Sequence, residues 1–263
     1  MIGRSVISVS GKDSFKFLQG LITSDLPSDL YELSYGALLT AQGKFLFDFL
    51  IFSSEKDKFY IDIDDSAKEE FLFRLFAYKL RLKIEIAETN MSVLLSTKKL
   101  EAPMSMCDPR NAELGFRTYF DDQLFINKNN YEDLLWGKEA YESVRIKNCV
   151  PEFGKELISN ETYILEANFV NLSGVSFTKG CFVGQEVTAR MRHKTKLRKG
   201  LKVIRSINSS SLNVLKYGSP IFSGPREVGK LLSCSDDFAI AYLRFDRIEE
   251  PLKCDSLRIE ILD

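Results

Sequence analysis

The residues with the clearest chemical potential lie in one twelve-residue run, KGCFVGQEVTAR, at positions 179–190. The thiol of this run, Cys181, stands between two glycines, shortly after Lys179, and Gln185 and Glu186 follow it. A nearby cation favours the thiolate form of a cysteine, and so would a helix beginning just after it. We interpret the run as a site built around Cys181. The alternative is a buried, inert cysteine at a tight helix entry.

A strongly basic segment follows the thiol. Its basic residues are Arg190, Arg192, His193, Lys194, Lys196, Arg198 and Lys199. Because the whole chain carries a formal net charge of only −1, so dense a run suggests an anionic ligand. Phosphate groups and the polyglutamate tail of a cofactor are candidates, and RNA is another. The alternative is a solvated linker into the next domain.

Two carboxylates stand within apolar sequence. Asp48 interrupts the strand-like run FLFDFLI, where an ionised group buried on both faces is costly unless it is paired. It could be a base or a ligand anchor with a perturbed pKa, or the solvent-facing residue of a half-buried strand. Glu166, in ILEAN, could accept two parallel hydrogen bonds from a pterin or guanine ring. A further acidic group, Asp62 with Asp64 and Asp65, is interpreted as a strand end and helix cap.

Composition and spacing argue against several function classes. The five cysteines, of which Cys181 is one, are widely spaced without a CxxC pair, and His193 is the only histidine. A disulfide framework, a zinc site and a stably bound metal are therefore not expected. The 263 residues include no apolar stretch of membrane-spanning length, and the first residues lack the apolar region of a signal peptide. A cytoplasmic location without membrane contact is predicted.

The elements that must position these groups follow an α+β pattern. Asp13 is predicted to cap a short helix, and 35–52 to form two strands around a turn at 42–43. Ser66 and Glu69 suggest a capping box for a helix over 67–80. A strand is expected over 118–127 and a helix over 131–141. After Gly200, short strands separated by turn residues predict a small β-barrel.

The signature KGCFVGQEVTAR resembles that of the YgfZ family, which usually has tyrosine where this chain has Phe182. The resemblance extends over nearly the whole chain. The other similar blocks are Phe17–Asp25, Leu38–Lys44, Asp108–Arg110, Leu114–Arg117, Val150–Lys155 and Leu165–Ala167.

The YgfZ family consists of folate-binding proteins related to the T-protein of the glycine cleavage system, and its members act in assembly or repair of iron–sulfur proteins. The resemblance therefore implies a three-lobed, T-protein-like α+β ring with antiparallel sheets, flanking helices and a C-terminal barrel. The implied lobes are 1–45 with 140–197 for folate, 46–139 as a ferredoxin-like lobe, and 198–263 as the barrel.

The resemblance also assigns roles to single residues. Cys181 becomes a reactive thiol, and Glu166 falls where T-proteins hold the pterin. Tetrahydrofolate or a derivative is the implied cofactor, iron–sulfur client or assembly proteins are the implied partners, and a monomer is expected. The implied folate-binding residues are Glu166, Lys179, Gln185, Glu186 and Arg190.

Two other functions stay open from the sequence. Asp48 falls near the catalytic carboxylate of T-proteins, so a folate-dependent aminomethyltransferase is the main alternative to a non-enzymatic accessory factor. Phe47 stands where T-proteins usually have a second acid, which argues against that alternative. An RNA-binding module that uses the basic segment is a third hypothesis, and the near-neutral net charge argues against it.

Overall fold

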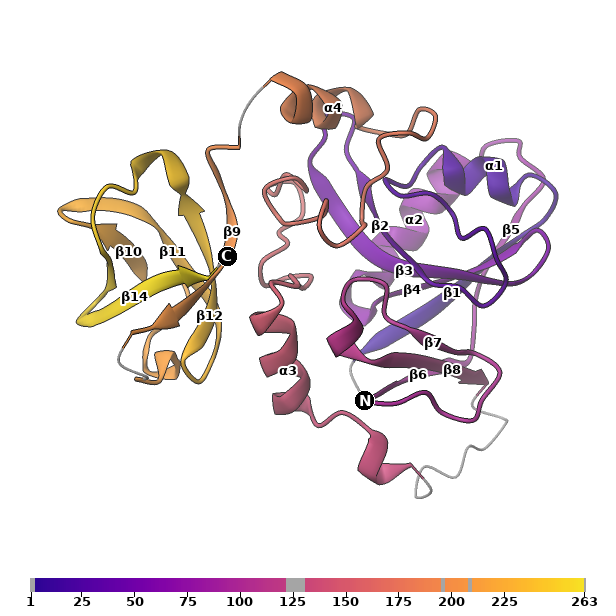
Figure 1. Cartoon of the computed structure of the whole chain (residues 1–263). Helices are drawn as coiled ribbons and strands as arrows, with labels where there is room; N and C mark the ends of the chain where they lie inside the picture. The colour runs from indigo at the N-terminus through magenta and orange to yellow at the C-terminus, as the bar shows by residue number, and fades with distance from the viewer. Residues whose placement is uncertain (1–2, 122–130, 195–196, 208–209, 263) are drawn as a thin grey trace. The chain divides into compact units, whose positions relative to one another are not determined.

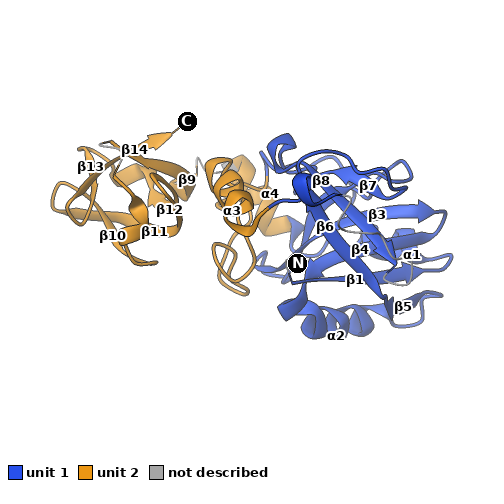
Figure 2. Ribbon diagram, turned by 90° about the horizontal axis from the view of Figure 1, so that it is seen from below, with its two compact units in different colours: residues 1–136, 170–185 blue, residues 137–169, 186–263 orange. Residues whose placement is uncertain are grey.

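The computed structural model describes residues 3–121, 131–194, 197–207 and 210–262. The chain divides into two compact units, 1–136 with 170–185 and 137–169 with 186–263 (Figure 2). Each unit is interleaved with the other along the sequence. The three predicted lobes, by contrast, divide the chain at residues 45, 139 and 197, and these lobe boundaries stay a prediction.

The first unit contains two antiparallel sheets (Figure 1). The larger has the strand order β2-β3-β4-β1-β5, and the smaller has the order β6-β8-β7. The strands of the larger sheet are β1 (Arg4–Ser10), β2 (Ser34–Leu39), β3 (Phe45–Glu55), β4 (Lys58–Asp64) and β5 (Glu85–Glu88). Those of the smaller are β6 (Met91–Ser96), β7 (Ser105–Cys107) and β8 (Phe116–Asp121).

The larger sheet is buried on both faces. Alternate residues of β3 point to opposite sides, and Phe47 and Phe49 each pack against Phe71 of helix α2 (Lys68–Lys79) at 5.5 Å between ring centroids. On the other side, Phe52 packs against Tyr119 of β8 at 4.6 Å. This two-sided burial explains why the sequence of β3 is almost continuously apolar. The short helix α1 (Ser14–Gln19) follows β1.

The second unit contains helix α3 (Lys138–Lys147) and a closed six-stranded barrel, in the order β10-β11-β12-β9-β14-β13. Arg145 of α3 is buried and donates a hydrogen bond to Ser233 of β11 at 3.0 Å, which attaches the helix to the barrel. Helix α4 (Gln185–Lys194) leads into the barrel. The barrel strands are β9 (Lys199–Ser206), β10 (Pro220–Ser223), β11 (Arg226–Ser235), β12 (Phe238–Arg244), β13 (Leu252–Cys254) and β14 (Leu257–Leu262).

The predicted antiparallel sheets, few helices and C-terminal barrel are confirmed. The helix predicted over 131–141 is wrong for residues 131–137, whereas 138–141 are the first residues of α3. Only a single 3-10 turn forms at Glu132–Leu134, and Leu135 and Trp136 then pair with β6 in extended backbone. Their apolar side chains lie at the β6 edge of the smaller sheet, and α3 begins only at Lys138. Of the strand expected over 118–127, β8 covers the part up to Asp121, and residues 122–127 lie outside the described residues.

The hydrogen bonds at two predicted helix caps differ from those expected. The capping box of Ser66 and Glu69 is wrong, because Asp64 instead accepts from the backbone N–H of Ser66 in a 3-10 turn ahead of α2. Asp13 does precede α1, but its carboxylate accepts from the backbone N–H of Lys83 at 2.8 Å. Among the described residues, no helix combines the length and the apolar character needed to cross a membrane.

Candidate functional site

Cys181 lies in the first unit, on the loop that precedes α4, and it is exposed. The next residue, Phe182, is buried and anchors the loop, and its carbonyl accepts from the N–H of Gln185 at 3.2 Å. The alternative of a buried Cys181 is therefore wrong, and its reactivity stays a prediction. The helix begins at Gln185. Cys181 therefore lies outside the first turn of the helix, which is where the effect of the helix dipole is concentrated.

Lys179 fastens this loop to the turn after α1. Its Nζ donates hydrogen bonds to the backbone oxygens of Ile22, at 2.9 Å, and Ser24, at 2.5 Å. The ammonium group also lies 5.7 Å from the centroid of the Phe182 ring. Burial lowers the pKa of Lys179 to about 8, against a smaller opposing effect of Asp25. The side chain predicted to bind folate thus makes two bonds within the fold.

Thr23 makes a second attachment between the same two segments. Its hydroxyl donates to the carbonyl of Gly174 at 2.6 Å and accepts from the N–H of Ala37 on β2 at 2.9 Å. Its own carbonyl accepts from the N–H of Ser176 at 2.9 Å. The loop that carries the thiol is therefore tied to the central sheet through one buried threonine.

Gly184 makes a third attachment, to the turn between β2 and β3. It has a φ of +83°, and a Cβ at this position would lie 2.6 Å from the carbonyl oxygen of Thr40. Only glycine combines that backbone conformation with so close an approach. Three blocks quoted from the sequence, around residues 17–25, 38–44 and 179–190, therefore meet around Cys181.

The remaining signature residues lie on α4. Gln185 is partly buried, and its side-chain nitrogen is 3.5 Å from the carbonyl of Gly180, which is a long hydrogen bond. Glu186 and Arg190 are exposed and belong to the second unit. Of the basic segment, Arg192, His193 and Arg198 are also exposed. The structure describes neither Lys196 nor the side chain of Lys194.

Glu166 is buried within the second unit beside the start of the barrel. Its Oε2 accepts from the hydroxyl of Tyr242 on β12 at 2.6 Å and lies 3.5 Å from the Nζ of Lys199. Burial and then the neighbouring Glu166 raise the pKa of Tyr242 above its ordinary value. Lys199, which the sequence grouped with the basic segment, is therefore half of an ion pair. One carboxylate oxygen of Glu166 is already engaged by the barrel.

Asp48 lies in the interior of the first unit, on the face of β3 away from α2. It is 5% exposed, so the alternative of a solvent-facing residue is wrong. Its Oδ2 accepts from the hydroxyl of Tyr35 at 3.1 Å, whereas its buried Oδ1 has no hydrogen-bond partner among the described residues. Burial raises the pKa of Asp48, and Arg4 and Arg110 oppose that effect. The site therefore contains one unsatisfied acceptor, which a ligand N–H could fill.

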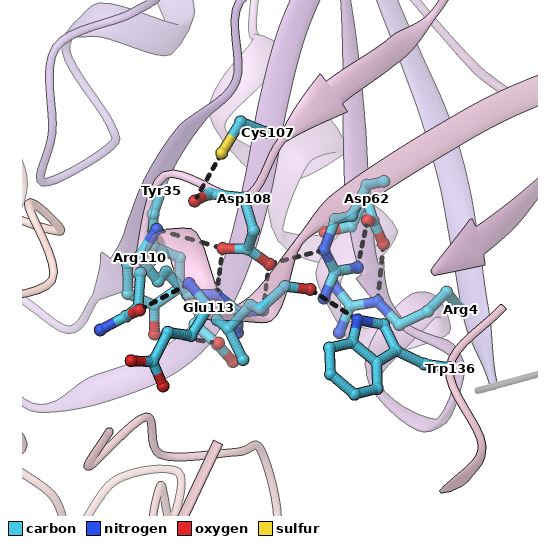
Figure 3. Close-up of polar contacts among 12 residues, drawn as sticks. Arg4, Tyr35, Asp62, Cys107, Asp108, Arg110, Glu113 and Trp136 are labelled. Atoms are coloured by element: carbon cyan, nitrogen blue, oxygen red, sulfur yellow. Dashed lines mark hydrogen bonds and ion pairs between the residues drawn. The ribbon is translucent and has the colours of Figure 1, made fainter. Parts of the chain in front are cut away.

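A buried cluster of charges next to Asp48 was missed by the sequence reasoning (Figure 3). Asp108 accepts from Arg110 at 2.7 and 2.9 Å and from Arg117 at 3.0 Å. Arg110 in turn lies over the ring of Tyr35, 5.4 Å from its centroid. Although burial opposes it, the two arginines hold the pKa of Asp108 well below its usual range. The sequence did contain a signal for this cluster, because Asp108, Arg110 and Arg117 stand in two of the blocks that resemble the YgfZ family.

Arg117 joins this cluster to Asp62. The carboxylate of Asp62 accepts from Arg117 at 2.9 Å, from Arg4 at 2.6 Å and from the hydroxyl of Tyr119 at 2.7 Å. Asp62 is fully buried near the end of β4, and Asp64 caps the turn that follows. The interpretation of this acidic group as a strand end and helix cap is therefore confirmed. Arg4 of β1 and Arg117 of β8 are thereby paired with Asp62 of β4, and Arg117 is also paired with Asp108.

Comparison with solved structures defines the class of fold. The chain matches the glycine cleavage system aminomethyltransferase T from Bartonella henselae with a TM-score of 0.77, over 100% of this chain and 83% of that one. The sequence identity is 13%, so the likeness concerns the fold. The predicted T-protein-like fold, with its antiparallel sheets and closed barrel, is confirmed.

Sequence comparison adds particular relatives. Residues 198–262 match the family model for the CAF17 C-terminal beta-barrel domain. The human mitochondrial iron-sulfur cluster assembly factor IBA57 is 27% identical over 95% of this chain and 78% of its own length. The homologue from Dictyostelium discoideum is 31% identical over 74% of this chain and 59% of its own length. Membership of the YgfZ family itself stays a prediction.

Proposed function

We propose that this chain is an accessory factor for assembly or repair of iron–sulfur proteins, with Cys181 as its reactive thiol. The observation that carries the proposal is the exposed cysteine on a loop fastened at Lys179, Thr23 and Gly184. A thiol that only filled space would not need to be exposed on so firmly held a loop. The relatives named as iron–sulfur cluster assembly factors supply the biological context.

The proposed chemistry is limited by the number of thiolates. Iron–sulfur clusters are generally held by four cysteines, and Cys181 can supply one of them. The cluster is therefore treated as cargo, shared with an assembly or client protein that supplies the other ligands. An exposed loop suits this role, because a partner can approach the sulfur directly while the fastened backbone limits its motion. Transient thiol redox chemistry at Cys181 would use the same exposure.

We also propose that tetrahydrofolate or a derivative binds this protein. The unpartnered Oδ1 of Asp48, in the first unit, suits a ring N–H donor. Glu166, whose Oε2 is already engaged by Tyr242 in the second unit, stays the carboxylate that the family resemblance assigns to the pterin. Arg190 and the exposed basic side chains near it would attract the glutamate tail of a folate. Bound folate would supply one-carbon chemistry, whereas these residues would bind and orient it. Lys179, Gln185 and Glu186 keep their predicted place near the ligand as part of this proposal.

A folate-dependent aminomethyltransferase is the second candidate, and one observation favours it. Asp48 is a buried carboxylate with a raised pKa, in a chain with the fold of an aminomethyltransferase. A buried carboxylate with a raised pKa can act as a general acid or base. Phe47 in place of a second acid weighs against this candidate. Turnover of an aminomethylated carrier, abolished by Asp48→Asn, would favour it over the accessory factor.

The main test compares two exposed cysteines in the same protein. Cells depleted of the endogenous factor are supplied with wild type, Cys181→Ser or Cys107→Ser, and the activity of a 4Fe–4S enzyme is measured. Cys107 is the matched control, since it is exposed like Cys181 but lies at the end of β7. Cys107→Ser should restore activity and Cys181→Ser should not. Full restoration by Cys181→Ser would contradict the proposed role of the thiol.

The proposed compartment is the cytoplasm, and the proposed partners are iron–sulfur client or assembly proteins. The relatives named above are mitochondrial proteins, so the compartment needs its own measurement, by fractionation of cells that make the tagged chain. Binding of RNA through the basic segment is tested by titration at two salt concentrations. An affinity that falls steeply with salt would support that third hypothesis.

A further inference from the structure

The outer face of helix α2 carries apolar side chains where a surface helix ordinarily carries polar ones. Phe71 and Leu75 are buried toward the sheet. On the opposite face, Phe73 is 71% exposed and Phe76 is 52% exposed, and Leu80, just after the helix, is 85% exposed. The spacing of three residues places Phe73 and Phe76 in one stripe, and Leu80 follows directly after the C-terminal end of the helix. A helix that is apolar on both faces is usually covered on both.

The two ends of this stripe have charges of opposite sign. Glu69 and Glu70 are exposed in the first turn, and Arg81 and Lys83 are exposed just after the helix. Glu70 also forms an ion pair with Arg74 at 3.4 Å. Both side chains are about half exposed, so a binding partner can reach them. The face is therefore acidic at one end, apolar in the middle and basic at the other end.

We propose that this face binds a second copy of the same chain, with the two α2 helices antiparallel. A two-fold axis places a surface patch against its own reversed copy. The acidic end, Glu69 and Glu70, then meets the basic end of the other copy, Arg81 and Lys83, at both ends of the contact. Near the axis, Phe73 of each copy faces Ala77 of the other, an exposed small residue that leaves room for the ring. A parallel pairing would oppose like charges.

The exposed area determines how strong this association is. Taking about 200 Å² for a whole phenylalanine, Phe73 and Phe76 together present about 250 Å² of uncovered surface. With Leu80 and the second copy, the apolar contact reaches roughly 800 Å², below the range of stable complexes. The dimer is therefore weak and reversible, with a dissociation constant on the order of 100 µM. Dilute protein should therefore be the monomer expected from the sequence, whereas concentrated protein should contain the dimer.

Sedimentation velocity of the full chain, in a concentration series that spans this constant, tests the proposal. The wild-type sedimentation coefficient should rise with concentration toward that of a dimer, and Phe73→Glu should weaken association at least about tenfold. Val214→Glu is the matched control, because Val214 is 76% exposed in the second unit. A wild type that stays monomeric throughout, or an equal effect of Val214→Glu, would overturn the proposal and leave the face to a different partner.

Charge reversal makes the test independent of the apolar contact. One chain carries Glu69→Lys with Glu70→Lys, and another carries Arg81→Glu with Lys83→Glu. Each alone should be monomeric, because like charges then meet at both ends, whereas an equimolar mixture should form a heterodimer. All four positions are exposed, so circular dichroism should report a native fold for both chains. Failure of the mixture to associate would contradict the antiparallel arrangement.

Discussion

The ammonium group of Lys179 is hydrogen-bonded to the backbone oxygen of Ser24, a residue 155 positions earlier in the chain. This single bond joins the turn after the first helix to the loop that carries Cys181. Ile22 accepts a second hydrogen bond from the same nitrogen, so one side chain adds two hydrogen bonds to the backbone bond between Ser176 and Thr23. The position of the loop that carries Cys181 therefore depends on hydrogen bonds from the Lys179 side chain to main-chain oxygens.

Replacing Lys179 by methionine should loosen this loop without unfolding the protein. Methionine keeps the aliphatic length but donates no hydrogen bond, so the carbonyls of Ile22 and Ser24 lose their partner. Amide hydrogen exchange over residues 174–184 should accelerate at least about tenfold, while exchange in β3 stays unchanged. Equal protection of the loop in wild type and variant would mean that Lys179 contributes nothing to its order.

Alanine at Gly184 should be far more harmful than alanine at Gly180. At Gly184 the added Cβ meets the Thr40 carbonyl at 2.6 Å on a backbone with positive φ, whereas at Gly180 nothing lies within 4 Å. We expect Gly184→Ala to lower the free energy of unfolding by about 1–3 kcal/mol, as measured by urea denaturation. Gly180→Ala is the control and should change it by less than about 0.5 kcal/mol. Equal effects would contradict the close packing at Gly184.

Two buried aspartates should affect the pH dependence of stability in opposite directions. Burial raises the pKa of Asp48, so above about pH 4 the unfolded chain loses this proton while the folded chain still holds it. Wild type should therefore lose stability relative to Asp48→Asn as pH rises from this value. The pKa of Asp108 is lowered by Arg110 and Arg117, so its stabilisation is present above about pH 4 and fades on acidification.

Urea denaturation between pH 3 and pH 7 measures both effects. Asp108→Asn should cost about 3–5 kcal/mol near neutral pH, because it leaves buried arginines partly unpaired, and this cost should shrink in acid. Asp48→Asn should cost least near neutral pH. Slopes of the same sign for the two variants would show that one of these environments is described wrongly.

Titration with tetrahydrofolate tests the folate part of the proposal. Wild type should bind, and Glu166→Ala should bind at least about tenfold more weakly, because it removes a buried carboxylate. Glu139→Ala, at an exposed position of α3, is the matched control and should bind like wild type. Isothermal calorimetry under reducing conditions provides the measurement. Equal affinities of wild type and Glu166→Ala would remove Glu166 from the folate site.

Much of the fold could be predicted from local patterns. Alternating side chains in the strands, turn residues and the short strands after Gly200 are local signals, and they identified the sheets and the barrel. The helix predicted over 131–141 failed at residues 131–137 because Leu135 and Trp136 owe their burial to β6, a partner that lies far away in sequence. Apolar spacing alone does not distinguish a helix face from a sheet edge.

The site was only partly predictable, for a related reason. Cys181 and its glycines were found because their residue types carry chemical meaning on their own. The role of Lys179 was missed because its partners are backbone oxygens, which every residue has. The burial of Asp62 was not predicted, because it is compensated by Arg4 and Arg117, and no local pattern reveals that distant cations will converge on one carboxylate.

The charged cluster between the two sheets also has a consequence for how they assemble. Side chains alternate along a strand, so a shift of β8 by one residue would turn Arg117 to the opposite face. Asp62 and Asp108 would then both lose a cation that they share in the native arrangement. These buried charges therefore select the register of β8 within its own sheet, in addition to the apolar side chains on the same strand.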